Sequence, residues 1–600
     1  DDVVPLKVQI DEEVDIDGSK RTHDGLSKAR SLLLPGHGRP GNASHSHRGY
    51  ENIEVAGRAD HDLSAEYRFP EAPTIRDYIM HPARSSKAFG TRLLTNFGWR
   101  FCLLIGCMYY GVKGTMMSIS GLGRLSYCKK TLHIDGAACQ TMSAISHTPW
   151  AIKGAIGVLS DAYPLFGYHK TSYIIVTAVL GTMSFLFLAA VPMSSPIAAA
   201  LFFFLGNLQI ATADLLCEGK YAEKMQEKPQ TGSSMVSFVW GLYLMGSLTA
   251  SLFVGPLADS DEPRVIYWIC VPIAASIILP VSFGYLQDDR VAAEQRGWDW
   301  SLMRRHPYVI AFCLIMALAA LGNATVDSIF FDSHGVQMTY ALSCTVLLSV
   351  LAFRWLPPQL ARCNFYMFIS NVLYVSIGGA LDFWFTASAT CVPNGPSFDY
   401  TYYQTYSSIV GSCTGWLGIV LFQATMSGWS FRRLFWVTTV LQVVASCFDL
   451  LLINRWNISI GVSDKVFYMF GDGIIAPMIG MFSAMPALVL TSKLVPKGLE
   501  ATVYALLAGF QNFGGVVSSQ IGLFAIQAFG VKTTEPCNFD NLGPLVAVTH
   551  CFLPLLAVPL TFWLIPDRLM TDTFVEEADA FSHSLSTHSD ASLPTPDDEE

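Results

Sequence analysis

The sequence has few charged residues. Asp, Glu, Lys and Arg make up only 14% of its 600 residues, against about 25% in ordinary soluble proteins. This scarcity argues against several soluble domains, which the length alone would allow. Most of the net charge of −10 lies in the segment after Pro566, which holds ten acidic residues and one Arg. The charge therefore says little about nucleic acid, and no nucleic-acid partner is expected.

Several local signatures are also absent. The chain has no G-x-S-x-G, no H-E-x-x-H and no Walker-type loop, so we expect neither an enzyme nor an ATP-driven pump. It has no CxxC pair and no Cys/His metal spacing, so no metal and no cofactor are expected. No signal peptide with a charged and then an apolar region precedes the first long apolar run.

Long apolar runs are abundant. Hydrophobic residues make up 51% of the chain, and many runs reach the roughly 20 residues that cross a bilayer core. The predicted fold class is an all-α polytopic membrane protein that lies in the lipid bilayer. Fourteen spans are predicted, at residues 97–120, 137–160, 172–192, 196–216, 233–256, 264–286, 307–330, 335–356, 363–385, 406–427, 432–453, 466–491, 501–529 and 544–565.

The spacing of these runs repeats. A long outer loop, a short inner loop and a polar inner loop recur in the same order in two sets of six spans, which is typical of major-facilitator transporters. Twelve spans is the alternative. Placing both tails in the cytosol leaves most Lys and Arg in inner loops, as the positive-inside rule expects. The predicted parts are a disordered cytosolic tail (1–96), a six-helix half (97–286), a cytosolic linker (287–306), an extra helix pair (307–356), a second half (363–565) and an acidic disordered cytosolic tail (566–600).

Two lysines lie inside predicted spans. Lys153 is near the inner end of its span, where a lysine can extend its side chain to water. The other interpretation is that Lys153 faces a cavity and contacts a carboxylate or an anionic substrate, because a charge inside a membrane is costly without a partner. Lys113 is harder to assign to an interface. Both lysines are predicted to bind substrate.

Asp214 and Glu218 are four residues apart, so they share one helix face. Two carboxyl groups this close favour protonation of one of them, which suits a proton-coupling site. A solvated helix end, paired with Lys220 and Lys224, is the alternative. Asp472 lies deeper, in FGDGIIAPMIG, and broken membrane helices of this kind often hold binding sites. We predict Asp472 in both substrate binding and proton coupling.

Further polar residues lie near predicted helix ends or in small-residue stretches. Gln511 and Asn512 can form hydrogen bonds across helices, and we predict that both contact the substrate. We expect Asp327, Asp382 and Asp449 to lie at the membrane–water interface. The predicted outer loops hold Cys128, Cys391 and Cys537, which allows one disulfide of undetermined pairing.

Three stretches together resemble the folate–biopterin transporter family of the major facilitator superfamily, and its protist branch most. They are PWAIKGAIGVLSDAYPLFGY (149–168), DLLCEGKYAE (214–223) and PKGLEATVYALLAGFQNFG (496–514). The similarity covers about residues 95–565. The resemblance implies secondary transport of folate or biopterin by alternating access, coupled to protons as a symporter, across the plasma membrane. The same branch includes carriers of S-adenosylmethionine, which is one alternative. A non-transporting sensor on the same scaffold is another.

The first stretch also resembles the facilitator loop between helices two and three. The usual G-x-x-x-D-x-x-G-R-[KR] pattern ends here in GYHK, so a histidine replaces a basic residue and weakens the charge of the loop. Gly154 stands where the family often has a proline. The resemblance implies a conformational latch formed by Gly157, Asp161, Gly167 and Lys170.

Overall fold

The computed structural model describes residues 80–227, 232–260, 262–293, 296–305, 307–494, 500–570 and 572. Most of the two predicted tails lies outside these residues, but residues 82–96, predicted to be disordered, form a helix. The chain up to Arg92 and the chain from Leu93 onward form two compact units. Of the first unit, only residues 80–92 are described, and they form most of helix α3 (Pro82–Phe97). The fold and the candidate site lie in the second unit.

The described part of the chain is helical and contains no β-strand. Short π-helical segments, labelled η, interrupt several helices. The elements of the first set of spans are α4 (Trp99–Gly106), η1 (Cys107–Met116), α5 (Met117–Leu122), α6 (Arg124–Ser126), η2 (Tyr127–Thr131), α7 (Gly136–Ala151), α8 (Lys153–Ala162), α9 (Thr171–Ala190), α10 (Pro196–Glu227), α11 (Gly232–Asp259), α12 (Val265–Ser276) and α13 (Ile278–Ser282).

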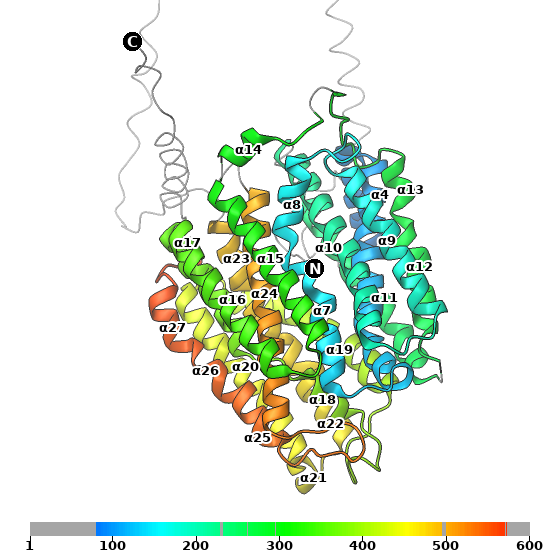
Figure 1. The fold of residues 1–600 in the computed structure, drawn as a ribbon, viewed down its shortest axis with the longest axis vertical. Coiled ribbons are helices and arrows are strands. Elements are labelled where there is room, and N and C mark those ends of the chain that lie inside the picture. Colours follow the sequence, from blue (N-terminus) through cyan, green and yellow to red (C-terminus); the bar gives the residue numbers. More distant parts are fainter. Residues whose placement is uncertain are drawn as a thin grey trace, which may run out of the picture. The chain divides into compact units, whose positions relative to one another are not determined.

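A short helix and a helix pair follow: α14 (Trp300–Arg305), α15 (Pro307–Ile329) and α16 (His334–Trp355). Figure 1 shows α14 and α21 at opposite ends of the helices. The last set comprises α17 (Pro358–Leu373), α18 (Gly378–Phe385), η5 (Thr401–Tyr406), α19 (Ser407–Thr425), α20 (Phe431–Ile453), α21 (Trp456–Ser459), α22 (Asp464–Tyr468), η6 (Met469–Ile475), α23 (Ala476–Leu494), α24 (Glu500–Ala528), α25 (Leu542–Val546), η7 (Ala547–Phe552), α26 (Leu553–Leu555) and α27 (Ala557–Leu564).

Every predicted span coincides with a helix or a run of helices. In the described residues, 11 helices are long and apolar enough to cross a membrane, and the pair α17–α18, bent by 42°, makes 12. The two remaining predicted spans are α7–α8 and α24, which carry more polar side chains. These two spans pack against each other. The fold is therefore an all-α polytopic one, and its least apolar helices meet inside it.

The break between α7 and α8 has a local cause. Asp135 caps α7, because its Oδ1 accepts the N–H of Ala138 at 2.7 Å. Pro149, near the other end of α7, cannot donate a backbone hydrogen bond and crowds the preceding turn. The helix ends two residues later, at Ala151, and Ile152 leaves helical geometry. Lys153 then begins α8.

Helices of the first and last sets meet along a seam. Helix α7 contacts α18 and α24, α8 contacts α24, and α11 contacts η5. The pair α15–α16 lies along the same seam, because α15 packs on α7, α8 and α24 and α16 packs on α24 and α17. The extra helices therefore touch both sets. The predicted domain boundaries themselves stay a prediction.

Side chains from other helices satisfy the backbone at the break between α17 and α18. Gln140 of α7 donates its Nε2 to the Ser376 carbonyl at 2.8 Å and accepts the Gly379 N–H through Oε1 at 2.9 Å. Ser518 of α24 accepts the Ser376 N–H at 2.9 Å. A broken membrane helix survives only where its freed backbone groups find such partners.

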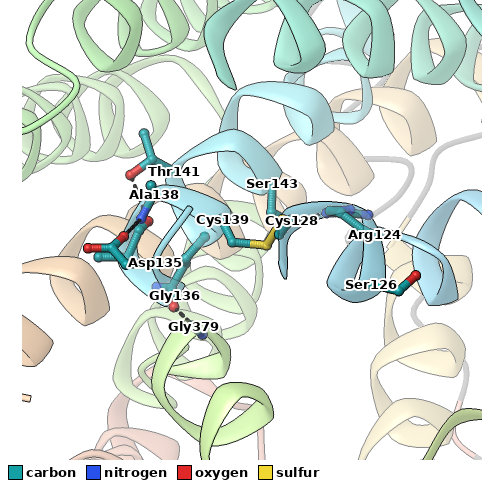
Figure 2. The surroundings of a disulfide bond; sticks show 12 residues. Arg124, Ser126, Cys128, Asp135, Gly136, Ala138, Cys139, Thr141, Ser143 and Gly379 are labelled. Atoms are coloured by element: carbon teal, nitrogen blue, oxygen red, sulfur yellow. Dashed lines mark hydrogen bonds between the residues drawn. A yellow bond between two sulfur atoms is a disulfide. The ribbon is translucent and has the colours of Figure 1, made fainter. Parts of the chain in front are cut away.

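Two disulfides lie at one end of the structure, which we call the disulfide end. They join Cys128 to Cys139 and Cys391 to Cys537. Figure 2 shows the first, between η2 and the start of α7. The sequence pointed to three of these four cysteines. Cys139 was missed because it lies within a predicted span, where cysteines usually act as small apolar residues.

The two sets of helices are closed against each other at the disulfide end. The backbones of Gly136 and Gly379 touch so closely that a Cβ on Gly136 would overlap the Gly379 carbonyl, and Figure 2 shows both residues next to the disulfide. The Gly136 N–H donates to Thr533 Oγ1 at 2.7 Å. Lys129 donates to Thr386 Oγ1 at 2.7 Å. These contacts hold the two sets of helices together at this end.

Candidate functional site

Three charged side chains from separate helices meet in the first set. Asp214 of α10 accepts Lys113 Nζ on Oδ1 at 2.8 Å and Lys153 Nζ on Oδ2 at 2.7 Å. The side chains of Asp214 and Lys153 are 2% and 9% exposed, whereas that of Lys113 is 20% exposed. We call these three residues the lysine–aspartate cluster. Two cations share one anion in it, and Lys113 is the more open cation.

The backbone places these side chains for identifiable reasons. Lys113 belongs to the π-helical η1, which packs tightly on α11. A Cβ on Gly114 would lie 2.7 Å from the Tyr109 carbonyl and 2.8 Å from the Tyr243 carbonyl, so only glycine permits this approach. π-helical turns are frequent at functional sites. Lys153 is positioned by the break after Pro149.

Aromatic rings surround the cluster. Lys153 Nζ lies 4.8 Å from the centre of the Trp150 ring, within the range of a cation–π contact. Trp150 donates Nε1 to Asn207 Oδ1 at 3.0 Å, which fixes the ring. Lys113 Nζ lies 6.0 Å from the rings of both Trp240 and Tyr243. The site therefore offers flat apolar faces beside positive charge.

The last set of helices reaches this site through Asn512. Its Nδ2 donates to the Trp150 carbonyl at 3.1 Å. Gln511 turns elsewhere and donates to Met367 Sδ at 3.0 Å. Phe510 stacks on Phe368 with ring centres 4.4 Å apart. Of the predicted pair, the structure brings Asn512 to the cluster and leaves Gln511 in a separate contact.

Glu218 lies one helical turn beyond Asp214. Tyr221 donates its hydroxyl to Glu218 Oε1 at 3.3 Å. Lys220 pairs with Glu223 at 2.9 Å, not with Asp214 or Glu218. Asp214 thus shares its charge with two lysines rather than with a second carboxyl group, and a proton-coupling role of the Asp214 and Glu218 pair stays a prediction.

Asp472 belongs to a second group of side chains, in the last set of helices. Its carboxyl group is within hydrogen-bonding reach of Asp449 of α20, and Asp382 of α18 acts on both electrostatically. Tyr403 donates its hydroxyl to Asp382 Oδ1 at 2.8 Å. Asp472 therefore does not join the lysine–aspartate cluster. The expected interfacial position is wrong for Asp449, which is only 8% exposed.

The predicted latch residues lie in and beside the loop between α8 and α9. Gly167 has a φ of 86°, a conformation that glycine adopts freely. Lys170 Nζ lies 3.6 Å from Glu223 Oε2. Asp288 of the linker accepts the N–H groups of Lys170 and Thr171 on Oδ2, at 2.9 and 2.8 Å.

The other two latch residues make weaker contacts. Asp161 is exposed, and a Cβ on Gly157 would meet only Leu215, at an ordinary 3.6 Å. Asp288, a residue that the sequence did not single out, holds the start of α9, and the Gly167 carbonyl accepts the Val291 N–H at 2.9 Å. An acidic side chain at a helix start is a recognised cap, but the distance of 117 residues along the chain hides the pairing with Thr171.

Asp327 is the clearest departure from the sequence expectations. It is 0% exposed rather than interfacial. Its Oδ2 accepts Asn323 Nδ2 at 2.9 Å and Gln520 Nε2 at 2.6 Å. The expectation failed because α24 covers the last turn of α15, which holds Asp327.

The fold and the buried charged site define a class, that of transporters with the major-facilitator fold. A solved nucleoside transporter, NupG, aligns over 78% of this chain and 100% of its own, at 13% identity and a TM-score of 0.52. That likeness shows the shared fold. The chain matches the BT1 family over residues 113–583, and it belongs to that family.

Two curated relatives agree with this assignment. The chain is 28% identical to probable folate-biopterin transporter 2 of Arabidopsis thaliana, over 84% of this chain and 91% of the relative. It is 27% identical to the folate-biopterin transporter of Synechocystis sp., over 74% of this chain and 78% of the relative. The chain is therefore an integral membrane protein of a transporter family.

Proposed function

We propose that this protein moves folate or a related pteridine across the plasma membrane by alternating access, driven by protons. The observation that carries the substrate class is the lysine–aspartate cluster. Lys113 and Lys153 bring two positive charges to one negative charge on Asp214. Folate carries two carboxylates on its glutamate, and one of them can pair with Lys113, the more exposed of the two lysines. Charge-assisted hydrogen bonds of this kind are the strong ones.

The surroundings of the cluster suit a flat heterocycle. Trp150, Trp240 and Tyr243 offer ring faces, and stacking of aromatic rings adds about 0.5–1.5 kcal/mol beyond burial. Asn512 can exchange its bond to the Trp150 carbonyl for a polar edge of a pterin. Phe510 is already stacked on Phe368, so Trp150 is the better partner.

The closed disulfide end supports alternating access. It also supports an orientation of the protein in the membrane. Disulfides form in oxidising compartments, so we assign this end to the outside of the cell. The loop held by Lys170 and Asp288 then lies inside, and both termini are cytosolic. In the proposed cycle the contacts of Gly136 and Gln140 with the last set of helices open to admit substrate, and the loop contacts change when the substrate leaves.

The test compares two substrates of different charge. Purified protein in vesicles is assayed for uptake of radiolabelled folate and of neutral biopterin, in the wild type, Lys113→Met and Lys153→Met. Losing one charge-assisted bond costs about 1.5–3 kcal/mol, so we expect KM for folate to rise about 10- to 100-fold. KM for biopterin should stay near the wild-type value. Lys532→Met removes an exposed lysine and serves as the control.

Each claim fails on a separate result. Equal losses for folate and biopterin would show that the lysines are structural rather than anion-binding. Uptake of S-adenosylmethionine in place of both substrates would overturn the substrate class. Binding without accumulation would identify a sensor. Uptake that ignores external pH and a protonophore would remove the proton coupling alone.

A further inference from the structure

Three fully buried polar side chains meet between α15 and α24. Asp327 and Asn323 lie one turn apart on α15, and Gln520 comes from α24. All three are 0% exposed. Both amides donate to the same oxygen, Asp327 Oδ2, at 2.9 and 2.6 Å. This set, which we call the Asp327 cluster, joins the extra helix pair to the last set of helices.

The Asp327 cluster has three oxygens without a partner. Asp327 Oδ1, Asn323 Oδ1 and Gln520 Oε1 are buried and form no hydrogen bond. Buried polar atoms are normally satisfied, so each exception calls for an explanation. A proton on Asp327 Oδ1 would make that atom a donor, and Asn323 and Gln520 each carry an amide oxygen that has no donor.

Among the residues that the structure describes, no cation pairs with Asp327. The helices that pack on α15 are α7, α8, α14, α16 and α24, and α24 has no ionisable group among its described side chains. The ionisable groups on the others, excluding the disulfide-bonded Cys139 and masked side chains, are His147, Lys153, Asp161, Arg304, His334, Tyr340, Cys344 and Arg354. No bond from any of these to Asp327 occurs in the described part of the chain. An ionised carboxyl group buried without a cation is costly, so the closed structure accommodates its neutral form better.

The Asp327 cluster is next to the closure at the disulfide end. The Ser519 carbonyl, one residue from Gln520, accepts Gln140 Nε2 at 3.0 Å. A Cβ on Gly522, two residues further, would overlap the Ser376 carbonyl. The turn of α24 that holds Asp327 is therefore the turn that seals α7 against the α17–α18 break. A change of charge on Asp327 acts directly on this seal.

We infer that Asp327 is the proton-binding residue that couples proton movement to closure of the disulfide end. This inference rests on the proposed proton-driven transport and names its site. When the end is open, water reaches Asp327 and the carboxyl group exchanges its proton with the outside. When the end closes, water leaves, and closure is favoured only for the protonated form. For external protons to drive uptake, the proton must then leave Asp327 to the cytosolic side, after folate and before the disulfide end opens again, so that one proton crosses the membrane in each cycle.

The experiment measures two activities of purified protein in vesicles. Active uptake of radiolabelled folate is compared with and without an inward proton gradient, and folate counterflow is measured without a gradient. For the wild type we expect the gradient to raise uptake about tenfold or more. Asp327→Asn keeps the shape and stays neutral, so its uptake should not respond to the gradient while counterflow persists. Asp327→Glu should keep part of the response.

Controls separate this inference from the proposed function. Asp332→Asn changes an exposed aspartate five residues away and should respond like the wild type. If Asp327→Asn does not reach the membrane, Gln520→Met replaces it, because loss of the link to α24 should also weaken the response and spare counterflow. An Asp327→Asn variant that responds as the wild type does overturns this inference and leaves the proposed function standing. If a Na⁺ gradient, or no gradient, drives folate uptake by the wild type, proton coupling is overturned. Folate counterflow still tests whether folate is the substrate.

Discussion

The lysine–aspartate cluster makes a prediction about stability that does not depend on the substrate. In Asp214→Asn the two ammonium groups of Lys113 and Lys153 keep their positions but lose the one anion between them. Their Nζ atoms lie 2.8 and 2.7 Å from its two oxygens. Removing one partner of a buried ion pair costs about 3–5 kcal/mol. Because both Nζ atoms bond to oxygens of one carboxyl group, they lie at most about 8 Å apart, and two like charges at that distance repel by about 2 kcal/mol at an effective dielectric constant of about 20.

The assay is thermal unfolding of the purified protein in detergent. With the usual unfolding entropy per residue, a chain of this size loses about 1 °C in Tm per kcal/mol. Adding the two costs, we expect Asp214→Asn to lower Tm by about 5 °C or more. Lys153→Met leaves Asp214 paired with Lys113 and should cost less. Adding Lys153→Met to Asp214→Asn removes the repulsion, so the double variant should be more stable than Asp214→Asn alone.

A non-additive result of this kind is the signature of direct coupling. Asp332→Asn, at an exposed carboxylate, is the matched control. Two outcomes would refute the reasoning. The first is a Tm for Asp214→Asn within experimental error of the wild type. The second is a double variant whose loss equals the sum of the two single losses.

Two further predictions concern the two ends of the transporter. Gly136→Ala places a methyl group against the Gly379 carbonyl, so the disulfide end should fail to close and folate uptake should fall at least about tenfold. Asp288→Ala removes the acceptor for the N–H groups of Lys170 and Thr171. Loss of a helix cap costs about 1 kcal/mol, so unfolding assays should show lower stability, and uptake should slow.

Nearby positions provide controls for both. A methyl group at Gly121 meets nothing within 4 Å, so Gly121→Ala should transport normally. Asp289 is exposed and next to Asp288, so Asp289→Ala should leave the stability unchanged. Normal uptake by Gly136→Ala would disprove the closure, and an Asp288→Ala variant no different from Asp289→Ala would disprove the cap.

The spans could be predicted because a bilayer leaves the backbone few choices. A long apolar run must satisfy its own N–H and C=O groups, and a helix does so. This reasoning located even α7–α8 and α24, which are too polar to pass a simple count of apolar spans. The break after Pro149 was not predicted, and around Asp472 the chain forms a π-helical segment within one continuous span rather than the predicted break.

The partners could not be predicted, because they depend on which helices pack together. Lys153 and Asp214 are 61 residues apart, and nothing local distinguishes that pairing from a pairing with a substrate. The sequence placed Asp327 at the membrane–water interface, because only the packing of α24 shows that this side chain is buried. The contact of Asn207 could have been predicted. Asn207 is an amide inside the apolar run FFFLGNLQI, and amide side chains in membrane helices usually form hydrogen bonds to other helices.

The break between α17 and α18 links the transport cycle to the activity of water. Gln140 satisfies the backbone of Ser376 and Gly379 only while the two sets of helices touch. When they separate, those groups must bond to incoming water, since a bare carbonyl or N–H in a membrane costs several kcal/mol. In the proposed cycle, each turnover would therefore hydrate and then dehydrate one short segment of backbone. Solutes that lower the activity of water would therefore shift the equilibrium toward the closed form without binding at the substrate site.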